Sequence, residues 1–305
     1  MKARKISFKM QVGLVLMVLL ASTCFGTTIC VNTTGTGGCY SSIQAAINAA
    51  AAGDTVKVMP GTYNECITIG KRIVLMGSGH EVTKIYCYAA DAVIFVAGSN
   101  SAKLMWFTIQ SGVGNGIDVS IDLFPYIFNN VIQCCGASGI WVNRAGPVIA
   151  NNVIYKNTWS GIHFTLGPYS PLVYNNVICN NLSCGYSCGG SYSCPEDVRS
   201  LNNCFWANAT NFCNGHVLGP GGIVQEPQFV NVKCDGDFHL ATGSPCIDKG
   251  RDGDYDCDGT RSDMGVYGGP NAYCGPGPVV TDLKLIPSPV VRGETFNIQA
   301  KGATR

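Results

Sequence analysis

The chain has 305 residues, of which only 13% are charged, and its formal net charge is +1. Proteins that bind nucleic acid through electrostatics carry a clustered basic face, so this composition excludes that class of partner. The length is compatible with one large domain or two smaller ones. The domain organisation therefore has to come from the pattern along the chain.

The first 26 residues have the pattern of a secretory signal peptide. Basic residues between Lys2 and Lys9 precede an apolar run from Val12 to Leu20, and small residues follow. This run is well short of the roughly 20 residues that a bilayer span needs. We therefore predict cleavage after Gly26 and a secreted or cell-surface protein without a transmembrane span in the mature chain.

The chain contains seventeen cysteines, and sixteen remain once Cys24 is lost with the signal or, in the alternative of a lipoprotein, lipidated. An even number of cysteines in an exported chain predicts disulfide bonds. Six of them lie between Cys179 and Cys213, in a stretch rich in glycine, serine and asparagine that departs from the surrounding pattern. Because the CxxC pairs of zinc ribbons are missing there, we interpret this stretch as a disulfide-held loop rather than a zinc site.

One sequence pattern recurs in the middle of the chain. PYIFNNVIQ, PVIANNVIY and PLVYNNVIC begin at Pro125, Pro147 and Pro171, and a Gly-Ile segment precedes each copy at Gly116, Gly139 and Gly161. Repeats of 20 to 50 residues are typical of solenoids, and short runs of valine and isoleucine favour strands. The leucine and asparagine pattern of leucine-rich repeats is absent. The repeat therefore predicts a parallel β-helix, with three short strands in each coil.

The repeat also predicts which side chains form the scaffold. Stacked coils bury their equivalent apolar positions, and asparagine tolerates the left-handed backbone of a tight bend. We predict that the asparagines of neighbouring coils hydrogen-bond to one another, as stacked amides do. The buried positions are Ile127, Ile149 and Val173, and the asparagines at the bend are Asn129, Asn151 and Asn175.

Both ends of the repeat region resemble a known group of proteins. SIQAAINAAAAGDTVKVMPGTYNECITIGKRIVLMGSG, from Ser42 to Gly79, resembles the start of secreted right-handed β-helix proteins of the pectate-lyase-like superfamily. QFVN, GDFHLATGSPCIDKG and DGDYDCDGTRSDMGVYGG resemble the closing segment of many bacterial surface β-helix proteins. The resemblance implies an all-β fold, a right-handed parallel β-helix over residues 39–270, with a short capping helix from Ile43 to Ala51.

The C-terminal residues differ from the repeat region. Residues 271–280 contain the glycine and proline of a linker. Residues 281–305 resemble the first strands of an immunoglobulin-like or secretion-sorting module, but about 25 residues are too few for an independent domain. We therefore predict the start of a truncated module there, with a folded tail that joins another surface as the alternative.

Strand alternation predicts one column of outward-facing side chains. If Ile117, Ile140 and Ile162 face the core, then Asp118, Trp141 and His163 face outward, with Asn143 beside them. An aromatic ring packs on the apolar face of a sugar while polar neighbours fix its orientation. We therefore predict a carbohydrate-binding site formed by four residues: Asp118, Trp141, Asn143 and His163.

These features give one leading function and two alternatives. The leading one is an exported protein that binds a polysaccharide or a cell-surface component along its lateral face, without an identifiable catalytic set. The first alternative is a polysaccharide lyase or glycoside hydrolase, with Asp118, Asp122, Arg144 and His163 as catalytic candidates. However, the coils carry few of the acids that a calcium-dependent lyase or a two-carboxylate hydrolase needs. The second alternative is a structural spacer or adhesin.

The stretch DGDYDCDGTRSD contains the strongest ligand-binding signal in the sequence. Asp254, Asp256 and Asp258 with Gly259 match the first half of a calcium loop. The second half does not match, although Asp263 could supply a ligand. We predict a structural Ca²⁺ and no other cofactor, with an acidic surface turn that closes the solenoid as the alternative.

Overall fold

The structure, a computed structural model, describes residues 26–165, 167–189, 198–274, 279–286 and 297–303. The predicted signal peptide lies outside these residues, apart from Gly26. Within the described ranges the chain forms one helix, α1 (Ile43–Ala49), and otherwise strands and turns. None of the helical structure in these ranges is long and apolar enough to cross a membrane.

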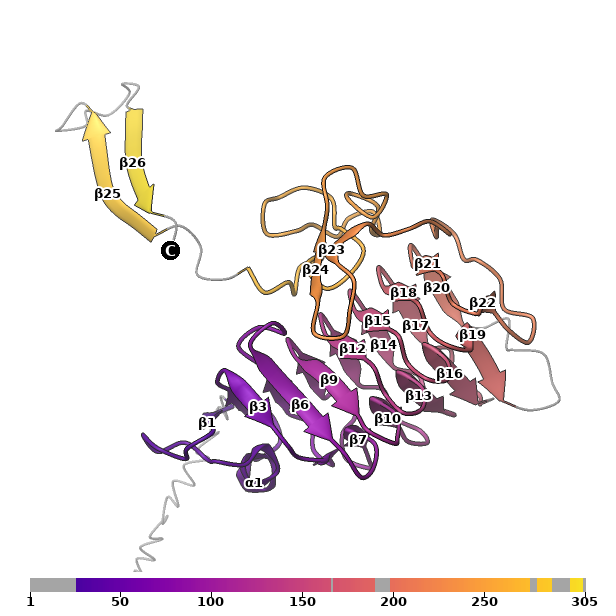
Figure 1. Cartoon of the computed structure of the whole chain (residues 1–305). Coiled ribbons are helices and arrows are strands. Elements are labelled where there is room, and N and C mark those ends of the chain that lie inside the picture. The colour runs from indigo at the N-terminus through magenta and orange to yellow at the C-terminus, as the bar shows by residue number, and fades with distance from the viewer. Residues whose placement is uncertain (1–25, 166, 190–197, 275–278, 287–296, 304–305) are drawn as a thin grey trace, which may run out of the picture.

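Three parallel sheets form the sides of a solenoid (Figure 1). Sheet A contains β1 (Thr28–Val31), β2 (Thr55–Val58), β5 (Val74–Met76), β8 (Lys103–Met105), β11 (Tyr126–Phe128), β14 (Val148–Ala150), β17 (Leu172–Tyr174) and β20 (Arg199–Leu201). Sheet B contains β3 (Gly61–Tyr63), β6 (Thr83–Cys87), β9 (Thr108–Ser111), β12 (Val131–Gln133), β15 (Val153–Tyr155), β18 (Val177–Cys179) and β21 (Cys204–Trp206). Sheet C contains β4 (Ile67–Ile69), β7 (Val93–Phe95), β10 (Ile117–Val119), β13 (Ile140–Asn143), β16 (Ile162–Thr165), β19 (Cys184–Gly189) and β22 (Thr210–Phe212). The all-β parallel solenoid predicted from the repeat is therefore confirmed.

The core consists of equivalent apolar residues stacked from coil to coil. Ile127, Ile149 and Val173 lie in register on adjacent strands of sheet A, and each is 0% exposed. Burying one such side chain contributes roughly 1.5–3 kcal/mol. The predicted inward positions are confirmed, and their regular spacing keeps the outward positions in register as well.

Two asparagine ladders run between the coils, and the first uses the second asparagine of each Asn-Asn pair. The side-chain oxygen of Asn152 accepts from the backbone amide of Asn130 (2.9 Å), and that of Asn176 accepts from the amide of Asn152 (2.9 Å). Asn157 and Asn181 form a second ladder at the next turn, where the Asn181 oxygen accepts from the Asn157 amide (3.0 Å).

The first asparagine of each pair has a different role from the one predicted. Its backbone is left-handed as expected, with φ of 51° at Asn129, 54° at Asn151 and 57° at Asn175. Its side chain, however, faces away from the neighbouring coils. Asn129 Nδ2 donates to the carbonyls of Val266 (2.9 Å) and Gly268 (2.7 Å). The prediction that these first asparagines bond to the copies above and below was wrong, because a C-terminal segment uses their amides.

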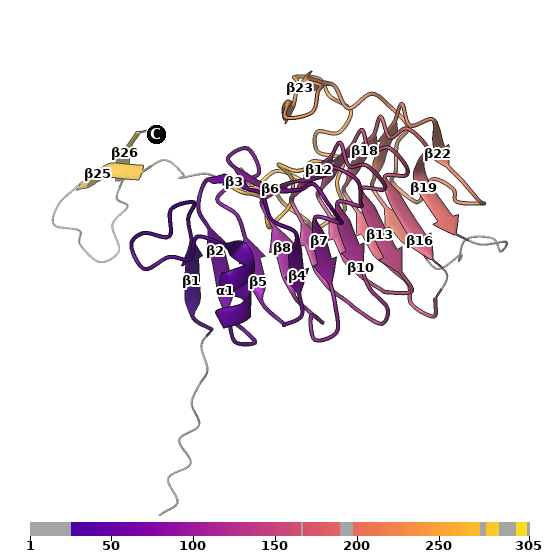
Figure 2. The ribbon, with the colours of Figure 1, turned by 60° about the horizontal axis from the view of Figure 1, so that its bottom comes forward.

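Helix α1 covers the N-terminal end of the solenoid (Figure 2). Ser42 is its N-cap, with a side chain that accepts from the amide of Ala45 (3.2 Å), and Ile43, Ala46 and Ile47 are buried. The helix ends two residues before the predicted Ala51. Beyond that point the Asp54 carboxylate accepts a hydrogen bond from the Ala51 amide (2.8 Å), and the chain forms a turn in place of more helix.

The cysteine-rich stretch contributes to the solenoid rather than forming a loop outside it. Strand β19 pairs in register with β16, and Tyr186 takes the inward position that isoleucine has in the preceding coils, at 0% exposure. The interpretation as a loop was wrong because the coil here uses tyrosine and cysteine as core residues. Part of the stretch, residues 190–197, lies outside the described residues.

Disulfide bonds are present as predicted. Among the described residues they join Cys30 to Cys39, Cys66 to Cys87, Cys134 to Cys234, Cys184 to Cys213 and Cys257 to Cys274. Not all of the cysteines form them: Cys135, Cys179, Cys204 and Cys246 are buried thiols.

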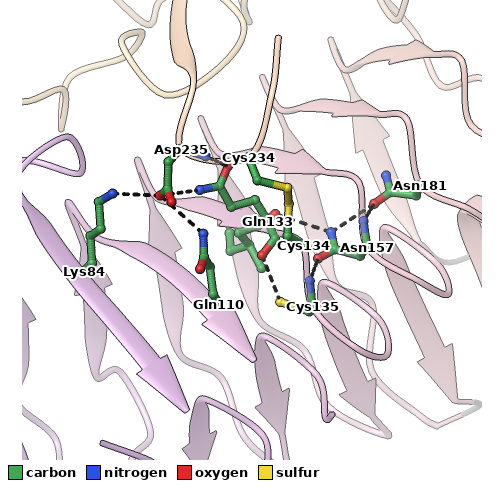
Figure 3. The surroundings of a disulfide bond; sticks show 10 residues. Lys84, Gln110, Gln133, Cys134, Cys135, Asn157, Asn181, Cys234 and Asp235 are labelled. Atoms are coloured by element: carbon green, nitrogen blue, oxygen red, sulfur yellow. Dashed lines mark hydrogen bonds and ion pairs between the residues drawn. A yellow bond between two sulfur atoms is a disulfide. The ribbon is translucent and has the colours of Figure 1, made fainter. Parts of the chain in front are cut away.

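Residues 229–274, which we call the closing segment, run from the last coils back toward the first. The segment begins with the antiparallel strands β23 (Phe229–Asn231) and β24 (Asp237–Leu240), which lie over sheet B in Figure 1. The Cys134–Cys234 disulfide fixes it to the solenoid, and beside that bond Asp235 accepts from Lys84 Nζ (2.8 Å), as Figure 3 shows. A second apolar core lies between this segment and sheet B.

The end of the chain forms a separate pair of strands. β25 (Val279–Ile286) and β26 (Asn297–Ala303) are antiparallel neighbours. The closing segment extends into the predicted linker, because Trp106 Nε1 donates to the carbonyl of Asn271 (2.7 Å) and Cys274 is bonded to Cys257. An immunoglobulin-like or sorting module over 281–305 stays a prediction.

Candidate functional site

One column of side chains follows the outer face of sheet C. Its members occupy equivalent positions on successive strands, as the strand register shows: Thr68, Ile94, Asp118, Trp141, His163 and Ser187. We call these six residues the outer column. The predicted neighbours Asp118, Trp141 and His163 are adjacent members of it, each partly exposed.

Trp141 and His163 are in contact within the outer column. Their ring centroids are 4.4 Å apart, and the planes are tilted by 41°. His163 Nδ1 is hydrogen-bonded to Ser187 Oγ (2.8 Å), which is in turn hydrogen-bonded to Ser160 Oγ (2.7 Å). The two serines therefore fix the imidazole, and the imidazole packs against one part of the indole surface.

The charges along the column are set mainly by burial. Partial burial, and secondarily the nearby carboxylate of Asp91, raises the pKa of Asp118 to about 6. Burial lowers the pKa of His163 below its ordinary value. At neutral pH the column thus presents a carboxylate and a neutral imidazole on the two sides of Trp141. Both groups can hydrogen-bond to a ligand hydroxyl.

The other predicted residues lie beside the column or in the turns that follow it. Thr165 Oγ1 donates to Asn143 Oδ1 (2.9 Å) and accepts from the backbone amide of Arg144 (3.0 Å). The amide of Asp122 donates to the carbonyl of Arg144 (3.2 Å), so these two turns are adjacent. The catalytic candidates are therefore divided between strands and turns, and a catalytic role for them stays a prediction.

The four aspartates of the predicted calcium loop have individual partners in the closing turn. Asp254 pairs with Arg251 (2.9 Å), Asp256 accepts from the amide of Asp263 (2.9 Å), Asp258 from that of Thr260 (2.9 Å), and Asp263 from that of Asp248 (2.8 Å). In the part of the chain that the structure describes, no three acidic, histidine or cysteine side chains are grouped so that they could hold a metal ion. The predicted Ca²⁺ gains no support from this geometry and stays a prediction.

Two residues that order the site were not among those predicted from the sequence. Ser187 and Ser160 orient His163, but Ser187 lies in the cysteine-rich stretch that was assigned to a loop. The spacing from His163 to Ser187 is 24 residues, which equals one repeat. That spacing is the signal that would have placed Ser187 in the column.

Comparison with known proteins identifies the family. Residues 92–245, about half of the chain, match the family model described as right handed beta helix region. The chain therefore belongs to the right-handed β-helix family, and the predicted handedness is confirmed. No curated protein matches the chain.

Several solved structures are similar to this chain at low identity. Pectin methylesterase PemA from Erwinia chrysanthemi is 13% identical, over 61% of this chain and 73% of that one, with a TM-score of 0.32. A pectin methylesterase from Aspergillus niger is 15% identical over 64% and 85%, with a TM-score of 0.37. Pectate lyase Pel9A is 13% identical over 79% and 96%, with a TM-score of 0.36.

Proposed function

We propose that this is an exported protein that binds a polysaccharide along the outer column of sheet C. The observation that carries the proposal is the contact between Trp141 and His163, with Asp118 next to them in register. An aromatic ring offers a large apolar surface, and the flanking carboxylate and imidazole offer hydrogen bonds of fixed direction. The column crosses several parallel strands, so an extended ligand contacts several coils at once.

Export is part of the same proposal. Five disulfide bonds among the described residues favour an oxidising compartment, because cytosolic thiols are kept reduced. The basic and apolar pattern of residues 1–26 agrees with that compartment. We place the protein outside the cell or on its surface.

A glycan array tests the proposal, using the secreted, oxidised protein with calcium or with a chelator. We expect retention on one class of polysaccharide without release of shorter products. Trp141→Ala should lose this retention, and Trp159→Ala, at an indole that is 55% exposed outside the column, is the matched control. Released product would instead support the lyase or hydrolase alternative. Retention that is equal in all three proteins would refute a binding role for the column.

A further inference from the structure

A cleft lies on a different side of the molecule from the outer column. The cleft, of about 1030 Å³, separates the first coils from the end of the closing segment. Its walls include His80, Glu81, Trp106, His239, Tyr267 and Tyr273. The volume is at the upper end of the range for ligand pockets, which is about 300–1,000 Å³. None of these residues belongs to the outer column.

Contacts between the two walls hold the cleft open in a fixed shape. The Tyr267 hydroxyl donates to Glu81 Oε1 (2.5 Å), and the Tyr267 ring packs edge-on against His80 with centroids 4.8 Å apart. The Tyr273 ring packs edge-on against Trp106, 5.2 Å away. The two walls are far apart in sequence but are joined by these contacts, so the cleft is formed before any ligand enters.

His80 lies in the wall of this cleft with its imidazole almost fully buried. His80 is 5% exposed, and its Nε2 has no hydrogen-bond partner within the described part of the chain. His80 lines both this cleft and a smaller adjoining cavity of about 430 Å³. Burial lowers the pKa of His80 to about 4, so the imidazole is neutral at physiological pH. Nε2 itself has almost no accessible surface, so a ligand in the cleft would contact the other lining residues and not this atom.

Trp106 is the second unusual residue of the cleft. It occupies the bend position that Asn129 has in the next coil, and its backbone is also left-handed, with φ of 69°. Asparagine adopts this conformation readily, whereas a bulky side chain there is strained. An asparagine could also donate a hydrogen bond to the closing segment, as Asn129 does. The indole therefore adds what asparagine lacks, a large aromatic wall for the cleft.

We propose that this cleft binds the end of an uncharged saccharide, one or two rings long, with a sugar ring packed against Trp106 and Tyr273. The aromatic side chains Trp106 and Tyr273 provide apolar surfaces for a sugar ring. Lys57 and Glu81, both in the lining, have opposite charges, so the cleft does not favour a strongly charged ligand. The cleft and the outer column share no residues, so saccharide binding in the cleft does not depend on polysaccharide binding by the outer column.

Isothermal titration of the full chain tests the proposal with glucose, galactose, N-acetylglucosamine, cellobiose and chitobiose as probes. We expect saturable binding of at least one probe. Trp106→Asn, which restores the residue found at the neighbouring bends, should weaken that binding at least tenfold. The exposed Trp159→Ala is the control and should bind as the unmodified protein does. Trp141→Ala should also bind these probes as the unmodified protein does, which distinguishes the cleft from the outer column.

Two further variants keep the test decisive if Trp106→Asn does not fold. Glu81→Gln and Tyr273→Ala should also weaken binding, because each removes a group that lines the cleft. If no probe binds at millimolar concentration, the proposal is overturned, and water alone fills the cleft. Binding that is lost in Trp141→Ala and kept in Trp106→Asn and Glu81→Gln would also overturn it, and would assign the sugar to the outer column.

Discussion

Cys134, at the end of a strand in sheet B, is joined by a disulfide to Cys234 of the closing segment, 100 residues further along the chain. The neighbouring Asp235 side chain accepts hydrogen bonds from Gln110 (3.3 Å) and Gln133 (3.2 Å) of the solenoid (Figure 3). The closing segment is thereby part of the folded unit, and it supplies one wall of the cleft described above.

Removing this disulfide should destabilise the protein strongly. In the chain-entropy model, a bond that closes about 100 residues contributes about 4.7 kcal/mol, and one that closes about nine contributes about 2.6 kcal/mol. The double variant Cys134→Ser and Cys234→Ser should therefore lose about 2 kcal/mol more than the double variant Cys30→Ser and Cys39→Ser. Denaturant unfolding measures both losses in the free energy of unfolding. Equal losses would show that the stabilisation does not depend on the length of chain that the disulfide closes.

Replacing a ladder asparagine should cost more than replacing an exposed one. Asn152 is 0% exposed, and its Nδ2 donates to the carbonyls of Ile127 (2.9 Å) and Ala150 (3.0 Å). Asn152→Ala leaves these groups without partners, so we expect a loss of about 3 kcal/mol or more. Asn64→Ala, at an exposed position, should stay within about 0.5 kcal/mol of the unmodified protein. Similar unfolding midpoints for the two variants would contradict a structural role for the ladder.

Ile149 tests the inward assignment of the repeat. Ile149→Asp places a charge without a partner in the centre of the coil, which costs far more than the net stability of a domain allows. We expect no folded, secreted protein. Ile149→Val removes one methylene and should fold with a loss of about 0.5–1.5 kcal/mol. A folded aspartate variant with an unchanged circular dichroism spectrum would show that this position does not face the core.

Asp118 should make stability depend on pH in a specific direction. Its folded-state pKa of about 6 is above the value of about 3.9 for an unfolded aspartate, so folding takes up a proton between these pH values. Ionisation of Asp118 therefore lowers stability progressively as the pH rises from about 4 to above 6. Asp118→Asn should be more stable by about 1 kcal/mol at pH 7.5, with solvent screening of this partly exposed group allowed for, and equal at pH 4. If Asp118→Asn were less stable than the unmodified protein at pH 7.5, this would contradict a raised pKa of Asp118 in the folded state.

The repeat allowed the solenoid and the outer column to be predicted, because equal coil lengths keep equivalent residues in register. Once Ile117 and Ile140 were assigned to the core, alternation placed Asp118 beside Trp141. The path of the closing segment could not be predicted in the same way. It depends on contacts between distant residues, such as the hydrogen bond from Trp106 to Asn271, which no local pattern encodes.

The two roles of the asparagine pairs show the same limit. Asn129 and Asn130 are adjacent and identical in type, yet one bonds to the closing segment and the other to the next coil. Only the position of the closing segment distinguishes them. The cleft residues His80 and Tyr267 are brought together by that segment too, so their proximity has no signature in the sequence.

The binding role of Trp141 is tested most directly by the dissociation constant for the polysaccharide that the array retains best. Trp141→Ala removes the indole and leaves the strand intact, so we expect affinity to fall about tenfold, which corresponds to about 1.4 kcal/mol, with an unchanged Tm. Trp159→Ala should bind as the unmodified protein does. Equal affinity for Trp141→Ala and the unmodified protein would contradict the proposal that the outer column is the binding site.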